Sequence, residues 1–256
     1  MRWFRRAPAL HVAVDEGTGP VVVLLHGLAS SAVTFDNVVP LIADSHRVIA
    51  LDLLGFGDSP RPEGATYSMA EHSAAVMRTL RRLGLRGPMV IVGHSMGALI
   101  AIRIAAMRPR WVIKVVVVSP PVYVTPEAVG DWRDRAALGL YLRIYDYLRA
   151  NKEFTMRAAA GLARLSPIKN LLDVSERNWT PFVLSLEHAI ESQTTVSDLA
   201  RVRVPVELVY GSIDPFLAPA GIELAESMRM VTAHRVEGGD HVIRKRMARV
   251  VASAIG

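Results

Sequence analysis

Ser95 lies at the centre of the segment Gly93–Gly97, where its hydroxyl could act as a nucleophile. An apolar, β-branched run leads into this segment, and an alanine-rich helical pattern from Met96 to Met107 follows it. A turn this sharp between a buried strand and a helix strains its central residue, and glycines two positions away remove Cβ atoms that would clash. Gly-x-Ser-x-Gly alone is as often an ordinary loop. The strand before it and the helix after it favour an exposed, reactive serine.

A serine hydroxyl needs a base to take its proton and a carboxylate to orient that base. Among the 8 histidines, His241 differs because it follows Gly238–Asp240 on a loop between the last strand and the last helix. Such a loop can bring an imidazole to the serine. Asp214 directly follows another predicted strand and is the preferred carboxylate. Asp198 is the second choice, whereas Asp240 is too near His241 in the chain for a good hydrogen bond to its ring.

Strands and helices alternate along most of the chain, which predicts an α/β fold with a mostly parallel sheet covered by helices on both faces. A capping pair, Ser68 and Glu71, predicts the start of a helix that Gly84 ends. The predicted strands are Val12 to Val14, Val21 to Leu25, Val48 to Leu51, Met89 to Val92, Val115 to Val118 and Val206 to Tyr210. The final helix is predicted to carry Ile243, Met247, Val250, Val251 and Ile255 on one face.

Only helical patterns occur between about Val122 and Ala200. A helical insertion between two strands of a parallel sheet usually lies over the carboxyl ends of the strands, where ligands bind. We therefore predict a core formed by residues 1–121 and 201–256, with residues 122–200 as a helical lid. Four aromatic residues could line a substrate pocket, although packing within the lid is favoured for any single one of them. They are Tyr123, Trp132, Tyr141 and Trp179.

Composition narrows the classes of function. The 256 residues are 51% hydrophobic, enough for one large core, and no apolar run is long enough to span a membrane. Cysteine is absent, which excludes disulfides and thiolate chemistry. The net charge of +6 comes from scattered arginines without a nucleic-acid motif, so we expect no nucleic-acid partner. The N-terminal segment Met1–Arg6 lacks the apolar stretch of a signal peptide. We expect a soluble, cytoplasmic protein whose N-terminal arm makes at most weak contact with membranes.

The chain resembles the α/β-hydrolase family, specifically its lid-bearing serine hydrolases with one helical insertion after the family's sixth strand. The resemblance covers about Leu10 to Pro121 and Ala200 to Gly256. It rests on His26-Gly27-Leu28, which matches the turn that supplies an oxyanion donor, on Asp52–Ser59, which matches D-x-x-G-x-G-x-S, and on Gly93–Gly97, which matches the nucleophile elbow. The chain order Ser95, Asp214, His241 is also that of the family.

One competing interpretation concerns the glycines of the second motif. Gly55-Phe56-Gly57 could begin a dinucleotide-binding turn. The third glycine of that fingerprint is missing, however, and Pro60 and Pro62 follow where a helix should begin. We therefore expect no organic cofactor and no metal.

The resemblance implies a mechanism. His241 would deprotonate Ser95, which attacks a carbonyl carbon, while the backbone N–H groups of Leu28 and Met96 hold the oxyanion. Water would then release the acyl group. Hydrolysis of carboxylic esters or thioesters of small apolar substrates is the leading expectation. The serine argues against epoxide hydrolase and haloalkane dehalogenase activity, because those relatives use aspartate at this position.

Two alternatives remain. The first is hydrolysis of carbon–carbon bonds in ring-cleavage diketones, which the same lid-bearing group performs with the same serine. It is disfavoured because His94 stands where asparagine is usual and Val242 where tryptophan is usual. The second is a ligand sensor on a hydrolase scaffold, which the complete set of three residues disfavours.

Overall fold

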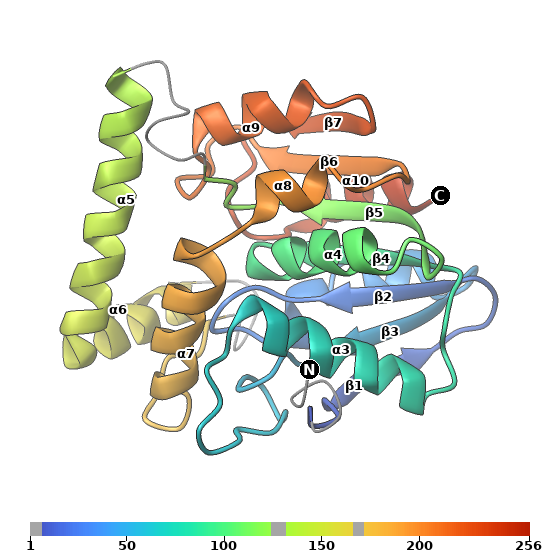
Figure 1. The fold of residues 1–256 in the computed structure, drawn as a ribbon, viewed down its shortest axis with the longest axis horizontal. Coiled ribbons are helices and arrows are strands. Elements are labelled where there is room, and N and C mark those ends of the chain that lie inside the picture. Colours follow the sequence, from blue (N-terminus) through green and yellow to red (C-terminus); the bar gives the residue numbers. More distant parts are fainter. Residues whose placement is uncertain (1–6, 124–131, 166–171) are drawn as a thin grey trace.

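The computed structural model describes residues 7–123, 132–165 and 172–256 of the chain. A seven-stranded sheet in the order β1-β3-β2-β4-β5-β6-β7 lies at its centre (Figure 1). β1 runs antiparallel to β3, and the other neighbouring strands are parallel. The mostly parallel sheet predicted from the alternating pattern is confirmed. The strands are β1 (Val12–Glu16), β2 (Val21–Leu25), β3 (Arg47–Leu51), β4 (Met89–His94), β5 (Val112–Val118), β6 (Val206–Gly211) and β7 (Val231–Val236).

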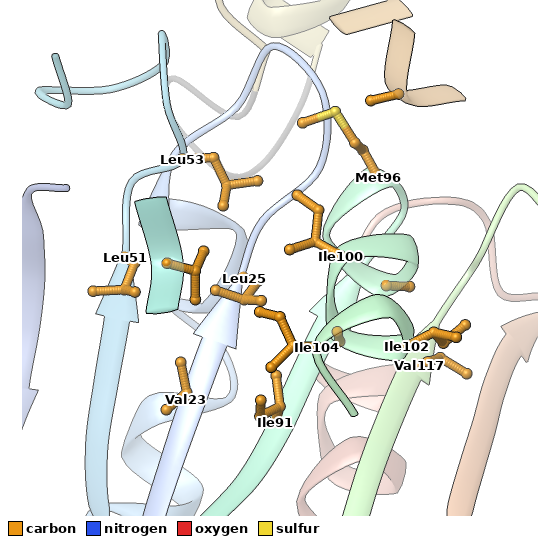
Figure 2. Close-up of a cluster of buried hydrophobic side chains, with 14 of the residues drawn as sticks. Val23, Leu25, Leu51, Leu53, Ile91, Met96, Ile100, Ile102, Ile104 and Val117 are labelled. Atoms are coloured by element: carbon orange, nitrogen blue, oxygen red, sulfur yellow. The ribbon is translucent and has the colours of Figure 1, made fainter. Parts of the chain in front are cut away.

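The central strands bury both of their faces, which explains their continuous apolar runs. Successive side chains point to opposite faces. Val22 and Leu24 belong to one hydrophobic cluster, whereas Val23 and Leu25 belong to the other. Figure 2 shows the cluster that contains Val23 and Leu25. In it, side chains of β2, β3, β4 and β5 meet those of helix α4 (Met96–Met107). Every residue of β4, the strand that leads to Ser95, is buried.

Helices cover both faces of the sheet. One layer contains α3 (Met69–Arg82), α4, α8 (Thr195–Leu199) and α9 (Pro219–Glu226). The opposite layer contains η1 (Ala32–Phe35), α2 (Val39–Ile42) and α10 (Lys245–Ile255). The predicted cap of α3 is present, since the Ser68 hydroxyl accepts a hydrogen bond from the Glu71 N–H at 3.4 Å. α10 begins two residues after the fully buried Ile243, which had been predicted to lie within it.

The segment between β5 and β6 is helical, and we call its described part the inserted segment. It comprises α5 (Trp132–Ala150), α6 (Lys152–Leu165), α7 (Trp179–Ser185), a π-helical stretch, η2 (Leu186–Glu191), and α8. The inserted segment follows β5, the fifth strand of the described sheet, whereas the family resemblance placed the insertion after the family's sixth strand. In Figure 1, α5, α6 and α7 lie beyond the ends to which the parallel strands point. None of the helices in the described ranges is long and apolar enough to cross a membrane.

Backbone and side-chain hydrogen bonds join the inserted segment to the core. The Asp173 N–H donates to the carbonyl of Ala29 at 2.7 Å. The Gln193 side-chain amide donates to the carbonyl of Pro121 at 2.8 Å. On α7, the Ser185 hydroxyl lies 3.0 Å from Nε2 of His72 in α3. The inserted segment is therefore anchored at several points around the carboxyl ends of the strands.

Candidate active site

Ser95 forms the turn between β4 and α4 and has a strained backbone. Its φ of 52° and ψ of −122° lie in a region that residues with a Cβ rarely adopt. Its N–H donates to the Val118 carbonyl of the neighbouring strand β5 at 2.9 Å. The adjacent strand thus fixes the turn, and the serine lies beyond the carboxyl end of β4.

The two glycines that flank the serine are required by close backbone contacts. A Cβ placed on Gly97 would lie 2.1 Å from the carbonyl oxygen of Leu25. One placed on Gly93 would lie 2.2 Å from the carbonyl oxygen of Gly97 itself. A side chain on Gly97 would therefore keep α4 away from β2, and a side chain on Gly93 would keep α4 away from the end of β4.

Replacing Gly97 with alanine is therefore expected to destabilise the fold, because the new methyl group meets rigid backbone. We expect the free energy of unfolding to fall by about 3 kcal/mol. Gly161→Ala in α6 is the control, since a Cβ there meets no atom within 4 Å. That change should stabilise the helix by about 0.5–1 kcal/mol. Urea unfolding of both variants measures the difference, and equal stabilities would contradict the close packing.

Asp214 and His241 are brought together from two loops. Nδ1 of His241 lies 2.8 Å from Oδ2 and 3.0 Å from Oδ1 of Asp214. The Asp214 side chain is fully buried, and the His241 side chain is 21% exposed. The ring of Phe216 packs edge-on against the imidazole, with 4.8 Å between the centroids. Because Nδ1 is engaged by the carboxylate, Nε2 is the nitrogen that can accept a proton.

The Asp214 carboxyl is held in its ionised form. Burial raises its pKa, but the hydrogen bond and charge interaction with His241 outweigh this effect, so that the pKa is lowered. The backbone N–H of Phe216, which donates to Oδ1 at 2.9 Å, and the Ser119 hydroxyl act in the same direction. Ser119 is completely buried at the end of β5, with a φ of 48°. Sequence reasoning missed this residue, because Ser119-Pro120-Pro121 signals only the end of a strand.

The loops that carry Asp214 and His241 are bonded to each other. The Ser212 N–H donates to the Val236 carbonyl, and the Ile213 N–H donates to the Gly239 carbonyl, both at 3.0 Å. A Cβ on Gly211 would lie 2.2 Å from the Gly239 carbonyl oxygen. The two loops consequently form one packed unit at the ends of β6 and β7.

The other carboxylates considered from sequence have different partners. Asp198 is buried and forms an ion pair with Arg103 at 2.8 Å. Asp240 accepts hydrogen bonds from the Val242 N–H and from the guanidinium of Arg244. Of these three carboxylates, Asp214 is the one that is hydrogen-bonded to the His241 ring.

The turn that follows β2 passes directly over Ser95. A Cβ on Gly27 would lie 3.0 Å from Cβ of Ser95. His26 holds this turn, because its Nδ1 donates to the Gly27 carbonyl at 2.7 Å while its Nε2 accepts from the Leu53 N–H at 2.8 Å. Leu28 is the next residue along this turn.

Met96 is the first residue of α4, so its N–H has no acceptor within the helix. Helix N-termini also stabilise negative charge. The start of α4 thus offers a backbone donor next to Ser95.

The Asp52–Ser59 segment supports the neighbouring loops. Asp52 accepts hydrogen bonds from the N–H groups of Ala32 and Asp58, both at 2.9 Å. Together with His11, these two aspartates place three possible metal-ligating atoms within 4.8 Å of one another. The Asp52 carboxylate already accepts bonds from two backbone N–H groups and faces Nδ1 of His11 at 2.9 Å. Its contacts are those of a residue that fixes loop structure.

The four aromatic residues considered for a substrate pocket divide into two groups. The Tyr123 hydroxyl lies 2.5 Å from that of Tyr145 in α5. Trp179 packs against Phe182, with 5.7 Å between ring centroids. These contacts favour packing within and beneath the inserted segment. Trp132 and Tyr141 belong to α5, but their side chains lie outside the described residues.

Three histidines are buried and neutral. Burial lowers the pKa of His26 to about 4 and the pKa of His72 and of His94 to about 3. In the unfolded chain each would bind a proton below its ordinary pKa of about 6.5. Folding therefore becomes less favourable as the pH falls from this value towards the folded-state pKa.

We expect the loss of stability between about pH 7.5 and about pH 5 to be about 2 kcal/mol for each of the three histidines. In His72→Gln, whose amide can replace the contact with Ser185, the loss should be smaller by that amount. Met77→Leu, an equally buried change on α3, should alter stability equally at both pH values. Urea unfolding at the two pH values measures these differences. An unchanged pH dependence in His72→Gln would show that this histidine is not held neutral.

Similarity to known proteins assigns the chain to a family. A model described as "Alpha/beta hydrolase family" matches residues 22–254. The chain belongs to the α/β-hydrolase family. The probable lysophospholipase BODYGUARD 4 of Arabidopsis thaliana is 32% identical to this hydrolase over 125 residues, 44% of this chain and 30% of the plant protein. The 2-(acetamidomethylene)succinate hydrolase of Mesorhizobium japonicum is 32% identical over 130 residues, 50% of this chain and 45% of that enzyme. Each match covers less than half of the relative.

Solved structures agree with this fold over nearly the whole α/β-hydrolase chain. A haloalkane dehalogenase from Bradyrhizobium elkani, DbeA, has a TM-score of 0.73 at 22% identity, covering 96% of this chain and 97% of that one. An E-2-(acetamidomethylene)succinate hydrolase has a TM-score of 0.70 at 21% identity, covering 94% and 91%. Because the identities are low, these likenesses establish the fold alone.

Proposed function

We propose that this α/β-hydrolase is a serine hydrolase in which Ser95 is the nucleophile, His241 the general base and Asp214 the carboxylate that orients the base. The observation that carries the proposal is the buried, ionised Asp214 bound at 2.8 Å to Nδ1 of His241. This bond fixes the tautomer in which Nε2 is bare and can accept a proton. Ser95, strained at the end of β4, supplies the hydroxyl.

In the proposed reaction, Nε2 of His241 takes the proton of the Ser95 hydroxyl as Oγ attacks the carbonyl carbon of the substrate. The N–H groups of Leu28 and Met96 bind the resulting oxyanion, and each is worth about 3 kcal/mol of the barrier. His241 then gives its proton to the departing alcohol or thiol, leaving an acyl group on Ser95. Water, deprotonated by His241, attacks this acyl group and releases the acid.

We propose carboxylic esters or thioesters of small apolar molecules as substrates. The names of the relatives, a lysophospholipase and a hydrolase of an organic acid, support hydrolysis of small lipid or organic molecules. The position of α5, α6 and α7 beyond the strand ends supports a role for the inserted segment as a lid over the site. Ser95 in place of aspartate separates this chain from the dehalogenases whose fold it shares.

A labelled fluorophosphonate, which reacts with activated serines, tests the proposal on the full chain. We expect one label per chain, mapped to Ser95 by peptide mass spectrometry, and turnover of short aryl esters. Acyl esters of graded length, a ring-fission diketone and a haloalkane are then compared as substrates. Failure of Ser95 to label would refute the nucleophile, and turnover of the diketone without any ester would replace the substrate class.

A further inference from the structure

His94, the residue before Ser95, bonds directly to the residue that carries the proposed base. Its Nε2 lies 2.8 Å from the backbone carbonyl oxygen of His241, and His94 as a whole is only 6% exposed. A carbonyl oxygen can only accept, so Nε2 of His94 carries the hydrogen and Nδ1 is bare. The two imidazoles also pack against each other, with 4.8 Å between their centroids.

The other side of the His94 ring faces the turn after β2, which contains Gly27 and passes over Ser95. Nδ1 of His94 has no hydrogen-bond partner among the residues that the structure describes. A Cβ placed on Gly27 would lie only 3.1 Å from this nitrogen. The imidazole of His94, at the end of β4, therefore bonds to the backbone of His241 on one side and lies next to the turn that precedes Leu28 on the other. A buried polar atom without a partner carries a free-energy cost, so the presence of a histidine here needs an explanation.

The charge of this ring is also relevant. Burial lowers the pKa of His94 to about 3, and the charge of His241 acts in the same direction, so the ring is neutral in the folded chain. Asp214 and His26 are the other titratable groups that influence it. A positive charge at this distance would oppose the formation of imidazolium on His241. Neutral His94 can hold the base without this penalty.

We propose that His94 is a positioning residue, whose Nε2–H holds the backbone of His241 so that the base meets Ser95. This inference rests on the proposed function. The competing explanation is that the ring only fills space between β4 and the loop of His241.

Three variants separate these explanations. In His94→Gln the amide nitrogen can reach the place of Nε2, in His94→Asn it falls short, and His94→Phe keeps the ring but has no donor. We expect kcat for a short aryl ester to stay within about threefold of the parent for Gln, and to fall by about 10- to 100-fold for Asn and Phe, with KM nearly unchanged. The rate of fluorophosphonate labelling of Ser95 should follow the same order. The pH profile of the Gln variant should match that of the parent, because a neutral residue replaces a neutral residue.

The outcomes are distinguishable. A parent chain whose Ser95 does not label overturns the proposed function and this inference together. If the parent labels and the Phe variant is as active as the parent while the Gln variant is inactive, the ring only fills space and this inference alone fails. Imidazole ¹⁵N spectra of the parent provide a test that needs no variant to fold. They should show His94 protonated at Nε2 only, and protonation at Nδ1 instead would overturn the proposal.

Discussion

Replacing Ser95 with alanine is expected to lower kcat for ester hydrolysis by roughly 10⁵- to 10⁶-fold, because the proposed acyl intermediate forms on the Ser95 hydroxyl. The fold should survive the change. Alanine already occurs at a positive φ in this chain, at Ala29 with a φ of 53° against 52° for Ser95. Steady-state rates on a short aryl ester and the thermal unfolding midpoint measure the two parts of this expectation.

Ser73→Ala is the matched control for this experiment. Ser73 is fully buried in α3, and its hydroxyl has no hydrogen-bond partner among the described residues. Its removal should leave the rate unchanged. A Ser95→Ala protein that hydrolyses the ester within tenfold of the parent would mean that another nucleophile does the chemistry.

Asp214→Asn is expected to lower kcat by about 10⁴-fold without disturbing the geometry of the loop. The amide of asparagine can donate to Nδ1 of His241, so the hydrogen of the imidazole then lies on Nε2. A protonated Nε2 cannot accept the serine proton. The change also removes the negative charge that stabilises the imidazolium. Asp198→Asn is the matched control, because Asp198 is equally buried but pairs with Arg103. Asp198→Asn should lower the stability of the fold and leave kcat unchanged. A large loss of kcat in Asp198→Asn, with an unchanged kcat in Asp214→Asn, would mean that Asp198 is the carboxylate that orients the base.

The same variant has a second readout at low pH. Because the pKa of Asp214 is lowered by folding, the carboxylate stabilises the folded chain above the ordinary pKa of an aspartate, about 3.9. This stabilisation is lost as the pH falls through the folded-state pKa. In acid unfolding, the free energy of unfolding of Asp214→Asn should therefore fall less over this pH range than that of the parent.

Much of the sheet could be predicted from the sequence because its central strands are buried on both faces, which gives each of them a continuous apolar run. β2 was predicted with its exact bounds, and β4 was predicted to within two residues. β5 extends three residues further towards its N-terminus than predicted, since the charged residue Lys114 interrupts the apolar pattern. The short elements η1, α2 and α9 have too few residues to produce a periodic signal.

The candidate site could be predicted only where motif and chain order carry information. Asp214 could be chosen because it follows a strand, and the structure places it on His241. The contacts of His94 and Ser119 could not be predicted, because each depends on a residue more than 90 positions away that folding alone brings near. The pattern around His94 indicated only that it lay beside a glycine turn.

The packed unit formed by the loops of Asp214 and His241 depends on β7, which lies at the edge of the sheet and pairs only with β6. Much of β7 is exposed, unlike β2 or β4. Edge elements with few buried contacts open at lower free energy than a core does. We therefore expect the strand that carries the proposed base to open at lower free energy than the strand of the nucleophile, so that activity can be lost reversibly while the core stays folded.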